Sequence, residues 1–353
     1  MINKTAKLES ILKLVESLPN SRAEGIIDEL FSKLAIEVNS VDNSVYTLNT
    51  ETVTFCRKCG SVHVVKNGKD RHGHTRFMCR DCGVTFGELS GTAVFGSHKD
   101  ASIWKKYISL MLEGCSLAKC AEECRISVPT AFVWRHKILN ALTDKSFSPS
   151  YNGLIEMDEM YVRISYKGNH KNSKGFTMPR KSFKRGSDNH IPGNNAKASV
   201  LCIVEREKGF SGLITCRGTL NLPLLEEIFD ERISDESIVL TDGLRAYNQY
   251  FRNKNTEHIV LQSHIGKPTV KGPYHINNVN ALQRRFRRFL IDYNGVSTKY
   301  LSNYLALFLW LENHKHCKKQ DLILEEITRV GSYISVMDLV AKAPVPELAP
   351  AVA

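Results

Sequence analysis

The sequence predicts a multidomain protein in which two small modules precede a larger α/β domain. Three observations support this prediction: two CxxC pairs within residues 51–92, a helical pattern over residues 97–145, and short β-rich runs that alternate with helical runs from Leu154 onwards. The chain has 353 residues, of which 42% are hydrophobic, so it is long enough to bury two or three cores.

The charge balance favours a polyanionic partner. The formal net charge is +11, but residues 1–50 hold five Lys and Arg against seven Asp and Glu, so the basic surplus lies beyond them. A basic surface raises the local concentration of nucleic acid, although a basic protein without such a partner is the alternative.

The ten cysteines point to a reducing compartment, because four of them form two CxxC pairs and the others are scattered. No apolar run reaches the ~18–20 residues of a membrane span, and the longest candidate, Tyr304–Leu311, is far shorter. With no leader pattern either, we expect a cytoplasmic protein without a membrane partner.

Residues 1–50 predict a helical N-terminal segment with two apolar stripes around Leu12 and Leu30. A hairpin of two helices that packs on neighbouring parts of the chain is the first interpretation, and a dimerisation element is the second.

The cysteine quartet predicts a zinc ribbon over residues 51–92. Two tight CxxC knuckles can complete a tetrahedron of thiolates around zinc, and with four ligands the site would be structural. The alternative is a set of unpaired structural cysteines. The basic loop Lys66–Arg76 between the pairs is either a phosphate-contacting edge or a solvated turn. The ligands would be Cys56, Cys59, Cys79 and Cys82.

A helix-turn-helix is predicted within residues 97–145. Ser116 would cap a short helix over Leu117–Glu123, and Val128-Pro129 would begin a second helix that runs to Leu142. In this motif the second helix enters the major groove of DNA, although ordinary helix pairs have similar lengths. The residues expected to contact DNA are Thr130, Trp134, Arg135 and Lys137.

The α/β domain is predicted over residues 151–318, followed by a helical segment and a flexible tail over 319–353. The expected strands are Leu154–Ser165, Lys197–Glu205, Phe210–Arg217, Ser237–Leu240 and His258–Leu261. The expected helices are Leu222–Ile233, Ala246–Phe251, Ile276–Leu290 and Thr298–His314. Between the first two strands, the Gly-containing insert Arg163–His190 holds eight Lys and Arg and one Asp, and is either a DNA-contacting segment or a surface loop without a role.

Two strands carry carboxylates in apolar surroundings. Asp158 lies within the first strand, and Asp242 ends the fourth before Gly243. A buried carboxylate is costly unless it is paired or binds a cation, although an Asp at a strand end also caps turns. On the predicted helix after Tyr274, Asn280 and Arg287 lie about 20° apart around the helix axis, so an amide oxygen and a guanidinium share one face. A solvated arginine run is the alternative for Arg284, Arg287 and Arg288.

The chain resembles the insertion-sequence transposases of the ISXO-like group, which join an N-terminal zinc ribbon to a DDE-type catalytic domain. Together the matching stretches span most of the chain from Phe55 to Leu311. They are the cysteine quartet, Met157–Tyr161, Leu240–Gly243, His275–Asn277, Val279–Ala281 and Gly295–Leu305.

The resemblance implies an RNase H-like catalytic domain and a transposase that binds element ends, cuts a strand and transfers it to target DNA. Asp158 and Asp242 would be catalytic metal ligands, and Asn280 stands where many DDE enzymes have Glu. Arg287 stands where the group usually has Lys. The metal would be Mg²⁺ or Mn²⁺, the partner double-stranded DNA, and the active form a homo-oligomer.

Three questions stay open from the sequence. His275, Asn277 or Asn278 could replace Asn280 as the third ligand, because all of them crowd one turn. A non-catalytic zinc-ribbon regulator derived from a transposase would need the zinc ribbon and the helix pair but neither aspartate. A metal-dependent nuclease would cut DNA without joining it.

Overall fold

The computed structural model describes residues 53–71, 73–168, 197–261, 272–342 and 349–350. The predicted N-terminal helices, the basic insert from residue 169 and most of the tail lie outside these residues. The chain forms two compact units, one that ends at Ser90 and includes Asp100–Ser102, and one made of Gly91–Lys99 and the chain from Ile103. Within the described ranges, no helix combines the length and apolarity that membrane crossing requires.

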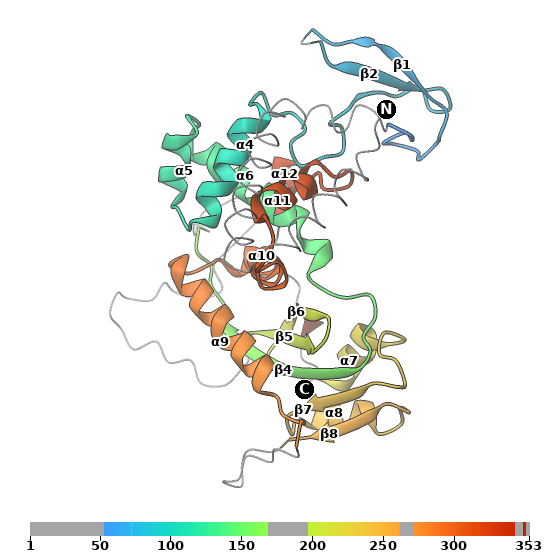
Figure 1. Cartoon of the computed structure of the whole chain (residues 1–353), viewed down its shortest axis with the longest axis vertical. Helices are drawn as coiled ribbons and strands as arrows, with labels where there is room; N and C mark the ends of the chain where they lie inside the picture. The colour runs from blue at the N-terminus through green and yellow to red at the C-terminus, as the bar shows by residue number, and fades with distance from the viewer. Residues whose placement is uncertain (1–52, 72, 169–196, 262–271, 343–348, 351–353) are drawn as a thin grey trace, which may run out of the picture. The chain divides into compact units, whose positions relative to one another are not determined.

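The first unit contains a three-stranded antiparallel sheet of β1 (Val64–Lys69), β2 (Thr75–Cys79) and β3 (Thr85–Gly87) (Figure 1). Its core consists of two stacked phenylalanines, Phe77 and Phe86, and two of the predicted ligand cysteines. So small a core needs a covalent or metal staple, which explains why the cysteines lie at its centre.

The second unit begins with a group of helices formed by α4 (Ala101–Leu112), α5 (Leu117–Glu123) and α6 (Val128–Ala141). Ser116 caps α5 as predicted, and Ser127 caps α6 by accepting a hydrogen bond from the Thr130 N–H. The indole rings of Trp104 and Trp134 stack at 3.7 Å between centroids, so α4 and α6 share a core.

A six-stranded mixed sheet forms the centre of the second unit, in the order β8-β7-β4-β5-β6-β9 (Figure 1). β4, β5 and β6 make an antiparallel meander, whereas β7 and β8 run parallel to β4. The two-residue β9, which the sequence does not predict, pairs with β6. The strands are β4 (Leu154–Arg163), β5 (Lys197–Glu205), β6 (Gly209–Arg217), β7 (Ile238–Thr241), β8 (Glu257–Val260) and β9 (Ala349–Pro350).

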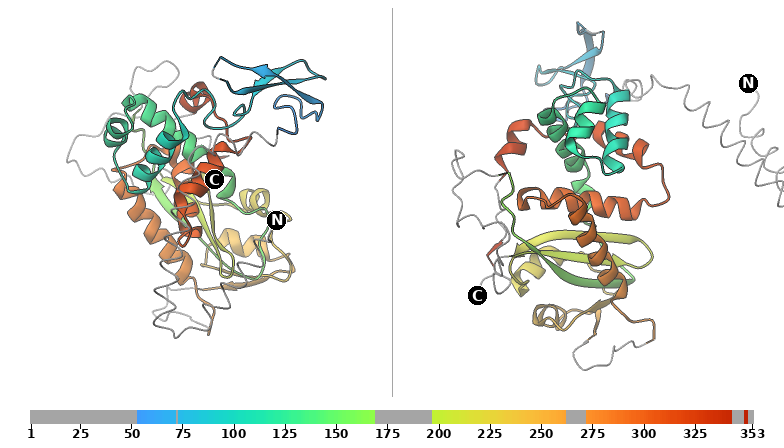
Figure 2. Two further views of the ribbon diagram at one scale, coloured as in Figure 1. Left: turned by 45° about the horizontal axis from the view of Figure 1, so that its top comes forward. Right: turned by 90° about the vertical axis from the view of Figure 1, so that its left-hand side faces the viewer.

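Helices cover both faces of this sheet (Figure 1 and Figure 2). One face packs against α7 (Leu222–Phe229) and α8 (Arg245–Phe251), and the other against α9 (Asn277–Asp292) and α10 (Leu301–Asn313). Strand residues alternate between the two faces, so Met157 lies in the first core and Met160 in the second. The remaining elements are the 3₁₀ turns η1 (Thr143–Lys145) and η2 (Thr298–Tyr300), α11 (Lys319–Thr328) and α12 (Val336–Ala341).

Candidate active site and metal centres

The parallel pairing of β4 with β7 brings the two predicted aspartates together. Glu156 lies opposite Leu240 in this ladder, so two residues further along each strand Asp158 and Asp242 are neighbours. Asp242 follows the end of β7, and its Oδ1 accepts a hydrogen bond from the Leu244 N–H at 3.0 Å. Asp242 therefore also caps the turn that follows β7, which was the alternative role predicted for an aspartate at a strand end.

A third carboxylate joins them. Ligand oxygens of Asp158, Glu159 and Asp242 lie within 4.8 Å of one another. The sequence analysis did not single out Glu159, because consecutive strand residues point to opposite faces of a sheet. Among the described residues, its buried Oε1 makes no hydrogen bond of normal geometry, and neither does the buried hydroxyl of Tyr247 in α8.

Burial and mutual repulsion disfavour the charged forms of Asp158 and Glu159. Burial, and next the negative charge of Asp242, raise the pKa of Asp158 to about 6. Burial, and next the charges of the two aspartates, raise the pKa of Glu159 to about 8. Two crowded carboxyls of raised pKa beside a third carboxyl fit a divalent cation, whose charge would favour the ionised forms of Asp158 and Glu159.

A separate carboxylate, Glu156, fixes the start of α9 to β4. Its side chain is fully buried and accepts hydrogen bonds from the backbone N–H groups of Asn278 and Val279 at 2.9 and 3.0 Å. It also accepts from the Asn278 amide at 2.7 Å and from Arg206 Nε at 2.8 Å. α9 has no capping side chain of its own, so Glu156 supplies the acceptors that its first turn needs.

One face of α9 is turned towards Asp158. Gln283 is buried and donates a hydrogen bond from Nε2 to Asp158 Oδ2 at 2.9 Å. Asn280 and Arg287, three residues before and four after Gln283, share this face and are exposed. The positive charge of Arg287 lowers the pKa of Asp158, against the stronger effect of burial.

The same network bears on the alternative ligands. The Asn278 amide donates to Glu156, and His275 Nδ1 lies 3.1 Å from Arg206 Nη2. Both side chains therefore already take part in the hydrogen-bond network around Glu156 that holds the start of α9. Asn277 is exposed at the first position of the helix. Asn280 therefore stays the prediction for the third ligand.

The arginines of α9 differ in their contacts and exposure. Arg285, which was not a predicted site residue, forms an ion pair with Glu312 of α10 at 2.7 Å and is structural. Arg284 and Arg288 are exposed, and Arg288 Nε lies 3.5 Å from Asp292 Oδ1 on the same helix. Both remain available as DNA contacts.

The four predicted zinc ligands converge in the first unit. Their sulfur atoms lie within 4.8 Å of one another, and the Cys56–Cys82 and Cys59–Cys79 pairs are each 3.6 Å apart. Tetrahedral zinc with Zn–S bonds of about 2.3 Å needs sulfurs separated by ~3.8 Å, so the spacing fits zinc.

The knuckle backbone supports the same site. Gly60 and Gly83, each directly after the second cysteine of a pair, have φ of +74° and +69°, which only glycine adopts freely. Backbone N–H donors, first that of Cys59, lower the pKa of Cys56 to about 6 and so favour its thiolate.

The predicted DNA contacts of α6 need correction at two positions. Trp134 is 6% exposed because it packs on Trp104, and Arg135 is 5% exposed because its Nη2 donates to the carbonyl of Cys115 at 2.8 Å. Neither side chain can reach a base edge from this position. Thr130 and Lys137 are half-buried and keep part of their surface.

The comparisons with known proteins agree with the resemblance found in the sequence. Residues 151–313 match the model of the ISXO2-like transposase domain, and residues 51–83 match the InsA N-terminal domain, a zinc ribbon. An uncharacterized protein in the transposable element ISH50 of Halobacterium salinarum is 26% identical over 261 residues, which cover 72% of this chain and 83% of that protein.

Solved structures resemble the chain only distantly. A simian T-cell lymphotropic virus intasome in complex with a PP2A regulatory subunit matches with a TM-score of 0.28 and 12% identity over 59% of this chain and 68% of that one. A pre-cleavage Mos1 transpososome matches with a TM-score of 0.25 and 13% identity over 67% and 80%. Likenesses of this size carry no argument about fold or function. Residues 151–313 are thus similar to the ISXO2-like transposase domain and residues 51–83 to the InsA zinc ribbon, and the similarity to the halobacterial transposable-element protein extends over most of the chain.

Proposed function

We propose that this chain is an insertion-sequence transposase that binds the ends of its element as double-stranded DNA, cuts a strand there and joins the new end to target DNA. The observation that carries the proposal is the meeting of Asp158 and Asp242, from adjacent parallel strands, in a cluster of three carboxyl groups whose oxygens lie within 4.8 Å of one another. The mixed sheet with helices on both faces supports the RNase H-like fold that the resemblance implies.

Asp158, Asp242 and Asn280 would hold Mg²⁺ or Mn²⁺, since these ions prefer hard oxygen ligands, and Glu159 would add a fourth oxygen. A pair of such ions, when bound, activates the attacking oxygen and stabilises the leaving oxygen of a phosphoryl transfer. Gln283 is a positioning residue that fixes the orientation of the Asp158 carboxylate. Arg287, exposed on the same helix face, would hold a phosphate of the bound strand.

DNA contacts are proposed for exposed arginines of α9, for two half-buried residues of α6 and for exposed basic residues of the first unit. Arg284 and Arg288 would bind the backbone near the cluster, and Thr130 and Lys137 would act from the second helix of the proposed helix-turn-helix. In the first unit, zinc bound by the four cysteines would stabilise the ribbon, and the exposed Lys66, Lys69 and Arg76 would contact phosphates. Since two element ends must be held together, the DNA-bound form would be a homo-oligomer.

The test uses duplex DNA with the inverted repeat that flanks the gene. With Mg²⁺, the wild type should release a cut strand, and Asp242→Asn should lose the product. Asp230→Asn is the matched control, because Asp230 is an exposed aspartate that pairs only peripherally, with Lys254 at 3.3 Å. Equal products from the wild type and Asp242→Asn would end the catalytic proposal and leave a DNA-binding regulator.

Strand transfer is tested separately. A duplex with a pre-cut 3′-OH end is supplied with a target plasmid, and joined product supports transfer. Cutting without joining would instead make the protein a nuclease.

A further inference from the structure

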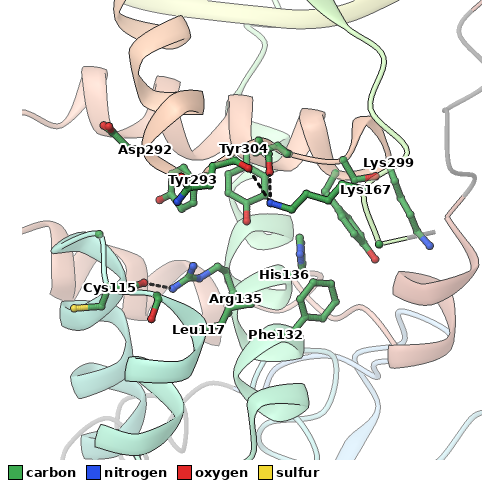
Figure 3. Close-up of a pocket in the computed structure, with 18 residues that line it drawn as sticks. Cys115, Leu117, Phe132, Arg135, His136, Lys167, Asp292, Tyr293, Lys299 and Tyr304 are labelled. Carbon is green, nitrogen blue, oxygen red and sulfur yellow. Dashed lines mark hydrogen bonds between the residues drawn. The ribbon is translucent and has the colours of Figure 1, made fainter. Parts of the chain in front are cut away.

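A cavity of about 640 Å³ lies within the second unit, between α6 and the chain that links α9 to α10 (Figure 3). Its volume is in the range of pockets that hold a small-molecule ligand. Six residues of the family-like stretch Gly295–Leu305, which the proposed chemistry does not use, line it. They are Gly295, Val296, Ser297, Lys299, Tyr300 and Tyr304.

The charges around the cavity favour an anion. Its lining contains the basic side chains Arg135, Lys167 and Lys299 and one acidic side chain, Asp292, which is already paired with Arg288. Lys167 donates to the carbonyls of Asn294 and Gly295, both at 2.9 Å, so its ammonium group is held at the wall by uncharged acceptors.

Arg135 is a buried cation without a counter-charge among its hydrogen-bond partners. Its Nη2 donates to the carbonyl of Cys115 at 2.8 Å and to the Cys120 thiol at 3.5 Å, and its buried Nε has no partner within the part of the chain that the structure describes. Burial raises the pKa of Cys120, so this thiol stays neutral. A buried guanidinium with neutral partners is costly, and an anion in the cavity would offset that cost.

The other walls are aromatic. Phe132, Tyr293, Tyr300 and Tyr304 line the cavity, and the His136 ring lies 4.4 Å from the Phe132 ring and 4.0 Å from the Tyr300 ring. His136 is 2% exposed and its Nδ1 has no hydrogen-bond partner. Burial lowers the pKa of His136 to about 3, so a neutral imidazole would offer this nitrogen to a ligand at neutral pH. Aromatic rings of this kind stack on planar bases.

We propose that this cavity binds a single nucleotide, with the base against the aromatic wall and the phosphate at Arg135 and Lys299. A nucleotide has a phosphate for the basic side chains and a planar base for the aromatic rings. A free phosphate would match only the basic side chains, and an uncharged ring only the aromatic ones. Within the proposed function, on which this step rests, the nucleotide is one that has left the stack of the element-end duplex. A free mononucleotide has the same chemistry, so the experiment must separate the two sources.

Binding of deoxynucleoside monophosphates to the zinc-containing full chain is measured by calorimetry without added Mg²⁺ or Mn²⁺ and in the Asp242→Asn background, which keeps the carboxylate cluster from contributing. We expect the monophosphate to bind at least about tenfold more tightly than the nucleoside or inorganic phosphate. Lys299→Ala and Tyr300→Ala should each weaken it by about tenfold or more. Lys254→Ala, at an exposed lysine outside the cavity, is the control. Equal affinities for phosphate and monophosphate, or an unchanged affinity in both cavity variants, would overturn the proposal.

The source is identified with inverted-repeat duplexes that carry 5-iodouracil at successive positions. Photocrosslinks to Phe132, His136 or Tyr300 at one position assign the ligand to DNA, whereas monophosphate binding without such crosslinks assigns it to a free nucleotide. The absence of both monophosphate binding and crosslinks refutes the nucleotide site. The proposed strand cleavage is tested independently, by comparing the wild type with Asp242→Asn.

Discussion

Glu156 offers a sharp test of how the active site is built, because one side chain joins β4 to the first turn of α9. Its Oε1 accepts from Arg206 Nε and the Asn278 side chain, and its Oε2 accepts from two backbone N–H groups. The Glu156→Gln substitution keeps the shape of the side chain, but the new NH₂ group cannot accept a hydrogen bond. Whichever way the amide turns, two donors lose their acceptor.

The size of the effect follows from these contacts. A buried donor left unsatisfied costs about 1–3 kcal/mol, and breaking a buried ion pair such as Glu156–Arg206 costs about 3–5 kcal/mol. Since both describe the same lost contacts, we expect Glu156→Gln to lower the free energy of unfolding of the α/β domain by about 3–5 kcal/mol. The amides of Asn278 and Val279 should also lose protection from hydrogen exchange.

Urea unfolding followed by far-UV circular dichroism measures the first quantity, and hydrogen exchange with mass spectrometry measures the second. Glu227→Gln, at an exposed glutamate of α7, is the control and should change neither. A loss below about 1 kcal/mol with normal amide protection would show that α9 does not depend on this anchor. If the anchor does position Asn280, the rate of strand cleavage should fall as well.

Three further outcomes are expected. Without metal, the pKa of Asp158 is about 6 in the folded protein against 3.8 in the unfolded chain, so between these pH values the folded protein binds more protons. The free energy of unfolding should therefore fall by about 3 kcal/mol as the pH rises from the lower value to the higher. Mg²⁺ should therefore raise the melting temperature more at pH 8 than at pH 5, and an equal rise would contradict the cation site. Gln283→Leu removes a hydrogen bond that lowers the pKa of Asp158, so the acidic limb of the cleavage pH profile should move upward, whereas a merely structural loss would lower the rate without moving it. Cys79→Ser should reduce zinc from about one ion per chain to none in metal analysis, with the exposed Cys317→Ser as control, and wild-type protein that folds without zinc would refute the ribbon site.

The sequence predicted the α/β elements well because their periodicity is strong. Lys197–Glu205 was predicted with the bounds that β5 has, and α7 begins at the predicted Leu222 but ends at Phe229, earlier than expected. The order of the strands could not be predicted from the sequence, because the pairing of β4 with β7 depends on contacts between residues that are far apart in the chain.

The site shows where local patterns fail. The pattern of acids in apolar strands pointed to Asp242 and to the acidic residues of β4, but the choice of Asp158 among them came from the family resemblance. Glu159 was not chosen, since strand alternation places it on the opposite face. Gln283 carried a usable signal, because it shares a helix face with Asn280 and Arg287. Trp134 and Arg135 were misplaced because α6 has apolar residues on nearly every side, so its sequence does not reveal which face is covered.

The ladder between β4 and β7 has a consequence for biosynthesis. The two strands are parallel, and the chain between them must first form β5, β6 and α7, so their union is a late and slow event in folding. A chain still emerging from the ribosome holds Asp158 well before Asp242 exists beside it, and before α9 has arrived to satisfy Glu156. The cluster of Asp158, Glu159 and Asp242 is thus complete only when synthesis of this domain is well advanced.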